Sequence, residues 1–278
     1  MKNLVLSIVS MASVFYLTTA RAQTEFRPLW EIGAGFAAID FPVYRGADER
    51  KFYLLPVPYF TYNGEILQVS RERVRGLIFK RDRVEMDVSV NGSVPARAAI
   101  ARQGMPDLDP TLELGPSLNF HLLYAEDKRN TFDMRLPWRA VVASDLSHFR
   151  HAGWLFQPQL NLDFHDIDHS GWNIGLVGGV IYADKHYHGY FYDVAPQYAT
   201  AMRPAYTVGG GYSGTQFILA FNKRHEGYWT GGFMKWDNLK GAVFADSPLV
   251  KSKGYFTVGF ALTWILDKSD RRVEVEYE

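Results

Sequence analysis

Apolar and polar residues alternate along much of this chain with a period of two. From 111 to 124 the even positions are apolar, and the odd positions are polar or small except for Leu123. The same alternation recurs over 131–142 and 153–164, and the even positions of 256–266 carry no charge. Successive side chains of a β-strand point to opposite faces, so this period indicates strands with one apolar and one polar face. The chain is therefore predicted to be all-β.

The alternating runs are also long. Strands of globular proteins usually have about 5 to 6 residues, whereas a tilted membrane-spanning strand needs about 9 to 11. Aromatic side chains stand toward the ends of the apolar faces, as in the interfacial girdles of outer-membrane barrels. We therefore favour a transmembrane β-barrel over a soluble β protein, which would also alternate. The aromatic residues are Tyr124, Trp154, Phe164, Trp172, Tyr182 and Trp264.

The chain length predicts a single antiparallel transmembrane β-barrel of about 12 strands, within a range of about 10 to 14. Residues 65–79 carry a cluster of charges, so they form either one spanning strand or two short strands around a charged turn. The predicted strands are 30–39, 51–62, 65–79, 83–91, 111–124, 131–142, 153–164, 172–182, 204–213, 215–224, 228–237 and 254–266, with longer connectors at 92–110, 183–203 and 238–253 and tight turns at Asn63-Gly64 and Ser213-Gly214.

Residues 1–22 have the pattern of a secretory signal peptide. Lys2 supplies a positive charge, residues 4–17 form an apolar stretch, and Ala20-Arg21-Ala22 has the small residues of a cleavage site. A retained anchor helix is the alternative, but the apolar run is short for one. We expect cleavage after this segment and export across a bacterial inner membrane, so that residues 23–278 form one outer-membrane β-barrel domain.

The overall charge and the cysteine count exclude several classes of function. The chain carries 30 basic and 30 acidic residues, whereas nucleic-acid binders normally have a basic excess. It has no cysteine, so disulfides and cysteine-ligated metals are excluded. No nucleic-acid partner is expected.

One polar connector contains the side-chain types of a catalytic triad. Ser144, Asp145 and His148 lie close together in the sequence, but a triad is defined by a geometry that spacing does not show. The Gly33-X-Gly35 pattern lies inside a strand and lacks the third glycine and the helix of a dinucleotide site. We therefore predict no enzymatic activity, no catalytic residue and no cofactor.

Histidines gather in three places and have the chemistry to ligate zinc or copper. Such histidines more often lie on solvated loops, and nothing in the sequence orients the rings, so no metal site is predicted. The groups are His148 with His151, His165 with Asp166, Asp168 and His169, and His186 with His188.

The polar faces of the predicted strands should line the inside of the barrel. A barrel of about 12 strands lies between the 8-stranded kind that side chains fill and the 16-stranded kind with an aqueous channel. A narrow or plugged lumen is therefore expected, with its charges paired across the interior, and a selective pore is the alternative. The predicted lumen-facing charges are Glu113, Asp133, Arg135, Arg139 and Asp163.

Glycine, proline and tyrosine residues recur in a set order along the whole chain. They are Gly33, Gly35, Pro42, Tyr44 and Gly46, then Pro56, Pro58 and Tyr62, then Tyr190, Tyr192 and Tyr198, then Arg203, Pro204 and Tyr206, the run Gly209 to Tyr212, and finally Leu239, Gly241, Ala242 and the run Asp246, Ser247, Pro248, Leu249, Val250. Their order and spacing resemble the MipA/OmpV family of Gram-negative outer-membrane proteins.

The resemblance implies an outer-membrane β-barrel whose best-known member is a scaffold. That member links a peptidoglycan lytic transglycosylase to a bifunctional penicillin-binding protein that synthesises peptidoglycan. Other members are porin-like or adhesive, so the alternative expectation is a narrow porin-like channel or a surface adhesin. The partners that the resemblance implies are outer-membrane lipid and these two classes of peptidoglycan enzyme.

The end of the chain departs from the usual pattern. Outer-membrane barrels typically finish on an aromatic residue, whereas Trp264 is followed here by a polar extension over 267–278. We favour an internal assembly signal around 259–264, and the alternative is a further short strand over 273–277.

Overall fold

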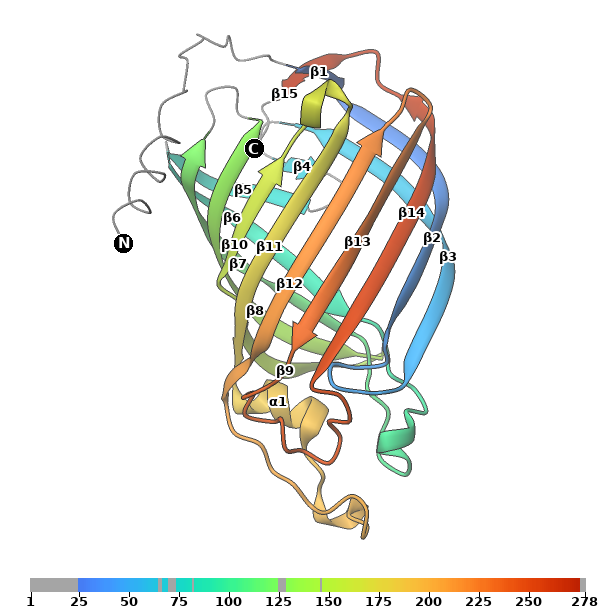
Figure 1. Cartoon of the computed structure of the whole chain (residues 1–278), viewed down its shortest axis with the longest axis vertical. Coiled ribbons are helices and arrows are strands. Elements are labelled where there is room, and N and C mark those ends of the chain that lie inside the picture. The colour runs from blue at the N-terminus through green and yellow to red at the C-terminus, as the bar shows by residue number, and fades with distance from the viewer. Residues whose placement is uncertain are drawn as a thin grey trace, which may run out of the picture.

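Antiparallel strands close on themselves to form a barrel (Figure 1). The computed structural model describes residues 25–64, 67–69, 74–81, 83–124, 129–145 and 147–275. The strands of the barrel sheet are β2 (Trp30–Pro42), β3 (Arg50–Asn63), β4 (Leu67–Val69), β5 (Val74–Arg81), β6 (Val84–Ser93), β7 (Thr111–Tyr124), β8 (Asn130–Ser144), β9 (Phe149–Phe156), β10 (Gln159–Phe164), β11 (Trp172–Ala183), β12 (Gly211–Arg224), β13 (Tyr228–Asn238) and β14 (Gly254–Lys268).

The closure depends on two joins in the sheet. β14 pairs with β2, which brings the last long strand beside the first. β9 and β10 both pair with β8 on one side and with β11 on the other, so they are two parts of one wall strand. With these two counted together, the described residues form a 12-stranded wall, as the sequence predicts.

The structure decides one open alternative in the predicted strand pattern and contradicts two other details of that pattern. Residues 65–79 contain two short strands, β4 and β5, which is one of the two forms left open above. The predicted strand 204–213 is wrong, because most of it belongs to a connector and β12 runs unbroken from Gly211. The Ser213-Gly214 turn is also wrong. Gly214 has φ +111° and lies opposite a register shift between β11 and β12. The Ser213-Gly214 pair therefore belongs to a β-bulge and not to a turn.

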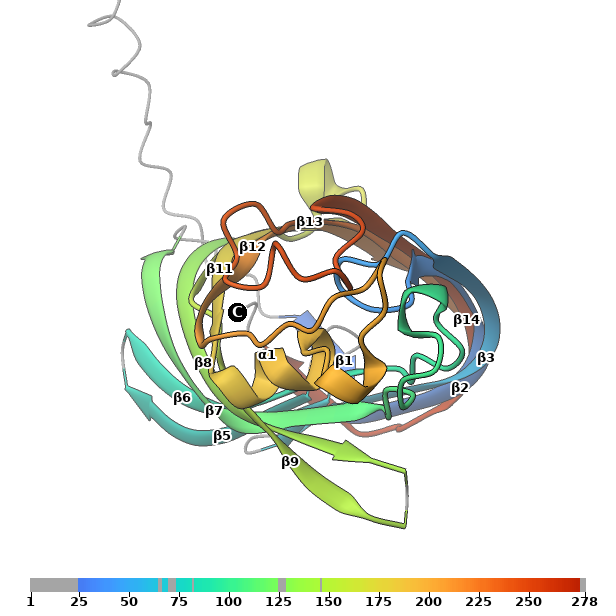
Figure 2. The same cartoon turned by 90° about the horizontal axis from the view of Figure 1, so that it is seen from below.

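The two ends of the barrel differ in the length of their connectors (Figure 1, Figure 2). At one end, here called the loop end, lie the long connectors 43–49, 94–110, 184–210 and 239–253. The 184–210 connector carries helix α1 (Lys185–Tyr192). The opposite end, here called the terminus end, has shorter connections such as 225–227. Within the described residues, no helix is long and apolar enough to cross a bilayer.

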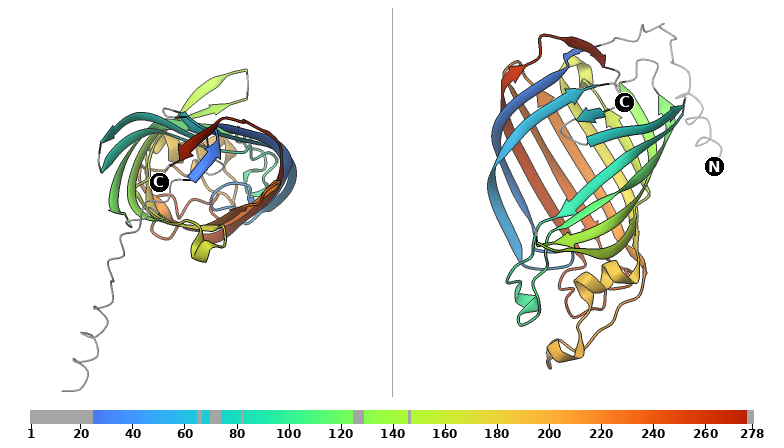
Figure 3. Two further views of the ribbon diagram at one scale, coloured as in Figure 1. Left: turned by 90° about the horizontal axis from the view of Figure 1, so that it is seen from above. Right: turned by 180° about the vertical axis from the view of Figure 1, so that it is seen from behind.

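The two ends of the described chain meet at the terminus end. Strand β1 (Glu25–Pro28) pairs with β15 (Arg272–Val275) in a separate two-stranded sheet that lies across the mouth of the barrel (Figure 3). The extension after Trp264 therefore supplies a short strand, which is the alternative to the favoured interpretation. This strand pairs outside the wall, so it does not add to the barrel. Residues 1–22 and Tyr277 lie outside the described residues.

The alternation of the sequence becomes an apolar outside and a polar inside. Residues that point outward on β2, β3 and β14 include Phe36, Phe52 and Phe260, all of them exposed. Residues that point inward on β7 and β8 include Ser117 and Asn119, both buried. This is the arrangement expected of a barrel surrounded by lipid, with its polar groups turned away from the hydrocarbon.

The seam between β2 and β14 is held close by two glycines. A Cβ atom at Gly33 would lie 1.9 Å from the carbonyl oxygen of Trp264, and one at Gly35 would lie 2.0 Å from that of Leu262. Both contacts are with backbone, which cannot move aside as a flexible side chain could. Small residues at these two positions are therefore a condition for joining the first and last long strands.

We expect Gly35→Val to destabilise the barrel by about 3 kcal/mol or more, at the upper end of the cost of overpacking. The matched control is Ala34→Val, whose side chain points outward at an exposed position of the same strand. Urea unfolding of the protein in detergent micelles, followed by tryptophan fluorescence, measures the difference. Equal unfolding free energies for the two variants would contradict this account of the seam.

Candidate functional site

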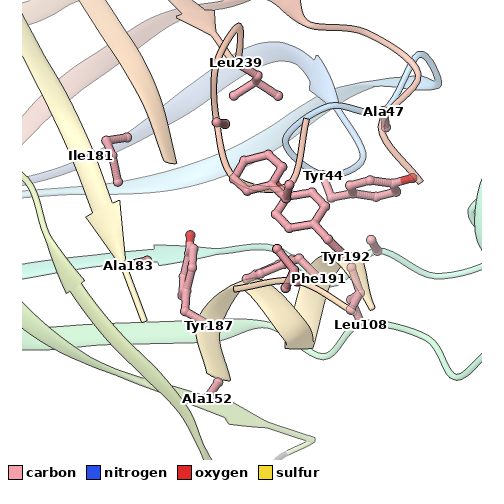
Figure 4. Packing of buried hydrophobic residues seen from close by; sticks show 14 of the residues in the cluster. Tyr44, Ala47, Leu108, Ala152, Ile181, Ala183, Tyr187, Phe191, Tyr192 and Leu239 are labelled. Carbon is pink, nitrogen blue, oxygen red and sulfur yellow. The ribbon is translucent and has the colours of Figure 1, made fainter. Parts of the chain in front are cut away.

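The connectors of the loop end fold across the mouth of the barrel and pack together there as an apolar plug (Figure 2, Figure 4). The rings of Tyr192 from α1 and Phe244 from the 239–253 connector stack with their centroids 3.8 Å apart and their planes 5° apart. Leu239 and Phe244 are completely buried. The plug also contains Tyr44, Ala47, Leu108, Tyr187, Phe191 and Val208. We refer to this cluster below as the plug.

Hydrogen bonds tie together plug segments that are far apart in the sequence. The Tyr44 hydroxyl donates to the Leu249 carbonyl over 2.7 Å, and the Tyr192 hydroxyl donates to the Arg45 carbonyl over 2.9 Å. The Ser247 hydroxyl donates to the Tyr192 carbonyl over 2.8 Å. Burial raises the pKa of Tyr44 to about 12, so this hydroxyl keeps its proton and remains a donor at neutral pH.

A buried ion pair anchors the plug to the barrel wall. Arg45 reaches from the 43–49 connector to β13, where its Nε donates to Asp237 Oδ1 over 3.2 Å. Its Nη2 donates to the Ser213 carbonyl on β12 over 3.0 Å. Burial by itself lowers the pKa of Arg45, but the Asp237 carboxylate outweighs it and holds that pKa well above its usual range. Because Asp237 is fully buried, it needs a cationic partner; Arg45 lies 3.2 Å from its Oδ1, and Lys235 lies farther away, 3.7 Å from its Oδ2.

Most of the family-motif residues gather at this mouth. Gly46 has φ +92°, a conformation that favours glycine, and its carbonyl accepts from the Lys251 and Ser252 amides. Arg203 donates to the carbonyls of Tyr198, Ala101 and Gln103, joining two connectors. Of the remaining motif residues, Pro42 ends β2, Pro204 and Tyr206 lie in the 184–210 connector, Ser247, Pro248 and Leu249 lie in the 239–253 connector, and Gly33 and Gly35 form the seam described above.

The predicted lumen-facing charges lie beneath the plug and contact one another. Arg139 Nε lies 3.1 Å from Glu113 Oε2, and the same guanidinium donates to Gln157. Arg135 Nη2 lies 3.4 Å from Asp133 and 3.6 Å from Asp163. The structure thus brings all five residues into two ion-pair groups on the inner wall.

Two further polar groups of the inner wall do not appear among the residues singled out from the sequence. His121 lies 2.8 Å from Asp133 and 3.8 Å from Glu85, so it extends the second ion-pair group to β6. Glu31 on β2 accepts from the Tyr59 hydroxyl at 2.8 Å and pairs with Arg224 across the lumen. His121 falls in the odd-position polar pattern of 111–124, but only the closed barrel shows which strands face one another.

Of the residues considered for catalysis, Ser144 is the last residue of β8, and Asp145 and His148 lie on the exposed turn that follows it. Asp145 accepts from the backbone amides of Ser147 and His148, which is the pattern of a turn-forming side chain. His148 is largely exposed. The histidine groups lie on separate elements, with His151 on β9 and His186 and His188 on α1. Within the described residues, no cluster of three or more histidine or acidic side chains is arranged to hold a metal ion.

His188 is the one histidine of these groups that is completely buried. Its Nδ1 donates to the Gly209 carbonyl over 2.9 Å, and its ring lies 5.1 Å from that of Phe244. Its Nε2 is buried with no hydrogen-bond partner among the described residues. Burial therefore lowers the pKa of His188, and the nearby Arg45 lowers it further, so the ring is neutral in the plug.

The Arg45–Asp237 pair predicts a clear double-mutant result. Arg45→Met should cost about 3–5 kcal/mol, because it leaves Asp237 buried and without its main partner. Asp237→Leu combined with Arg45→Met should recover most of this loss, since an apolar pair needs no counter-charge. Urea unfolding of the wild type, both single variants and the double variant gives the coupling energy. Additive losses would show that the pair does not anchor the plug.

The lowered pKa of His188 predicts that the plug loosens in acid. The unfolded plug would bind the proton more readily than the folded one, so stability is present above pH ~6.5 and falls as the pH drops below it. Amide hydrogen exchange of residues 239–253 should therefore speed up between about pH 8 and about pH 5, after correction for the intrinsic rate. His188→Phe should remove this dependence. The same pH response in wild type and variant would rule out His188 as its source.

Comparison with known proteins gives the chain its family. The family model described as "MltA-interacting protein MipA" matches residues 32–266. The outer membrane protein OmpV of Vibrio cholerae serotype O1 is 30% identical over 104 residues, which are 36% of this chain and 39% of that protein. Outer membrane protein Omp26La of Vibrio anguillarum is 29% identical over 104 residues, with the same coverage. The matched stretch thus spans about two fifths of the length of these relatives.

Two solved structures have similar elements. The Ralstonia pickettii toluene transporter TbuX is 8% identical, with a TM-score of 0.27, and the match covers 88% of this chain and 71% of TbuX. OprG of Pseudomonas aeruginosa is 10% identical, with a TM-score of 0.24, and the match covers 88% of this chain and 96% of OprG. Since the family model spans most of the chain, including both the seam and the plug, the chain belongs to the MltA-interacting protein MipA family.

Proposed function

We propose that the protein is an outer-membrane barrel whose loop end faces the cell exterior and whose terminus end faces the periplasm. Barrels of this kind have short periplasmic turns and longer extracellular loops, which matches the difference between the two ends. The exposed apolar outer face and the names of the relatives support the same location. A cleaved signal peptide over residues 1–22 is part of this proposal.

In that membrane, the protein serves as a non-enzymatic scaffold that links a peptidoglycan lytic transglycosylase to a bifunctional penicillin-binding protein. The observation that carries this proposal is the plug, because a barrel filled by packed aromatic side chains at its mouth is a poor conduit and a rigid platform. The family description, which names an interaction with MltA, supports a role in binding a protein partner.

The surface offered to periplasmic partners is the terminus end. There the segment from Asp267 to Arg272 is mostly exposed and carries charges of both signs, next to the β1–β15 sheet. Peptidoglycan enzymes work in the periplasm, so a scaffold must contact them from this side. Charged rims of this kind set the orientation and rate of association more than the affinity.

The scaffold proposal predicts that charge reversal at the terminus end weakens partner capture. Arg271→Glu combined with Arg272→Glu should reduce the amount of lytic transglycosylase and penicillin-binding protein recovered with the barrel from cross-linked envelopes. The control is Lys251→Glu combined with Lys253→Glu, which makes the same charge change at the loop end and should capture normally.

Single-channel recording in planar bilayers tests the same proposal from the other side. The purified wild-type barrel should show little conductance, because the plug fills the mouth. If the protein conducts ions steadily and captures no peptidoglycan enzyme, it is a channel rather than a scaffold. If it instead binds host surfaces without those enzymes, the adhesin alternative is correct.

A further inference from the structure

The barrel wall is interrupted beside strand β3. On one side β3 pairs with β2 along almost its whole length, from Arg50 to Tyr62. On its other side, pairing within the described residues is confined to Tyr62 and Asn63, which meet β4. The remaining length of this edge, residues 50–61, has no strand partner in the described part of the chain. Figure 3 shows β3 diverging there from β5 and β6.

The strand that faces this edge is also incomplete in its pairing. β6 meets β5 over residues 84–87, while residues 88–93 pair with β7 alone among the described strands. At the loop end, the Lys51 ammonium donates to the Arg97 carbonyl, and the Ile100 amide donates to Glu49. The interruption is therefore a window in the wall, bounded by these contacts at the loop end and by β4 at the terminus end.

Two prolines adapt the edge of β3 to this window. The Asn63 amide donates to the Leu29 carbonyl, so odd-numbered residues of β3 turn their N–H groups toward β2. The register with β2 is unbroken, so even-numbered residues turn their amide nitrogens toward the window. Pro56 and Pro58 are even-numbered and carry no N–H group. They remove two donors that would otherwise lack a partner, and they make the edge a poor template for an added strand.

The inner wall on the β3 side of the window is apolar, whereas on the β6 side it carries polar residues such as Asp87 and Ser89. Tyr59 points inward to Glu31, so Leu55 and Val57 on the same face of β3 also point inward. Leu55 is nevertheless 46% exposed, so there is open space in front of it. The inward-facing neighbours are Gly35, Ala37 and Ile39 on β2 and Gly259, Ala261 and Thr263 on β14, and of these only Thr263 is polar.

We propose that an acyl chain of a bilayer lipid enters the barrel through this window and lies against the apolar strip of Leu55, Val57 and Ala37. The outer face of the same strand is continuous with the bilayer, because Phe52, Leu54 and Phe60 are exposed there. Hydrocarbon is the occupant that fits the side chains of this strip, since they are apolar and gain from burial against it. A second copy pairing edge to edge would lack the two donors that the prolines remove.

Quenching by brominated lipid tests this proposal. The chain has no cysteine, so Leu55→Cys carries a single bimane label in proteoliposomes made with dibrominated phosphatidylcholine. We expect a loss of fluorescence close to that of Leu54→Cys, whose side chain points outward into lipid. Ile218→Cys points inward from β12, which is paired on both sides, and should show little loss. Mobility on unboiled gels shows whether each variant is folded, and Val57→Cys replaces Leu55→Cys if that variant does not fold.

The outcomes separate this inference from the proposed membrane location, on which it rests. Quenching at Leu54 without quenching at Leu55 or Val57 would overturn the window while leaving the location intact. An absence of quenching at Leu54 would instead contradict the location itself. Equal quenching at Leu55 and Ile218 would mean that lipid reaches the lumen by a route other than the window. The scaffold role is tested independently by partner capture.

Discussion

The hydrogen-bonding requirement of backbone amides and carbonyls in lipid is the constraint on which this structure depends. With no water to satisfy them, strands in a bilayer must pair on both sides, and a sheet achieves this by closing on itself. The closing seam between β2 and β14 admits no side chain at Gly33 and Gly35. Once the sheet closes, the period of two in the sequence decides which side chains meet lipid and which meet one another inside.

A closed barrel of 12 strands has an interior too wide for its wall side chains to fill, because it is wider than the 8-stranded kind that they do fill. The chain uses its long connectors to occupy the loop end. Apolar rings such as Tyr192 and Phe244 fill the space, and the buried Arg45–Asp237 pair connects the filling to the wall. A buried ion pair is a weak source of stability but strongly penalises misplacement, so it suits a contact that must specify position.

The parts of the fold that follow from local pattern could be predicted from the sequence. The all-β barrel, its 12 strands and its family follow from alternation, length and motif order. The predictions that are wrong fall where one local sequence pattern can form two different structures. Ser213-Gly214 has the sequence of a tight turn but forms a bulge. The sequence does not single out Arg45 and Asp237, because their contact joins residues 192 positions apart and no local spacing encodes such a contact.

The same hydrogen-bonding requirement explains the sequence at the edge of β3 that is unpaired among the described strands. An edge left open in lipid costs several kcal/mol for each unsatisfied group, so an interruption persists only where the sequence lowers that cost. Pro56 and Pro58 do this by having no donor to satisfy, and they fall at the even positions that face the window rather than β2. With the plug filling the loop end, movement along the axis from that side meets packed aromatic rings. The side of the barrel at β3 is thus the place where we propose that lipid reaches the apolar interior.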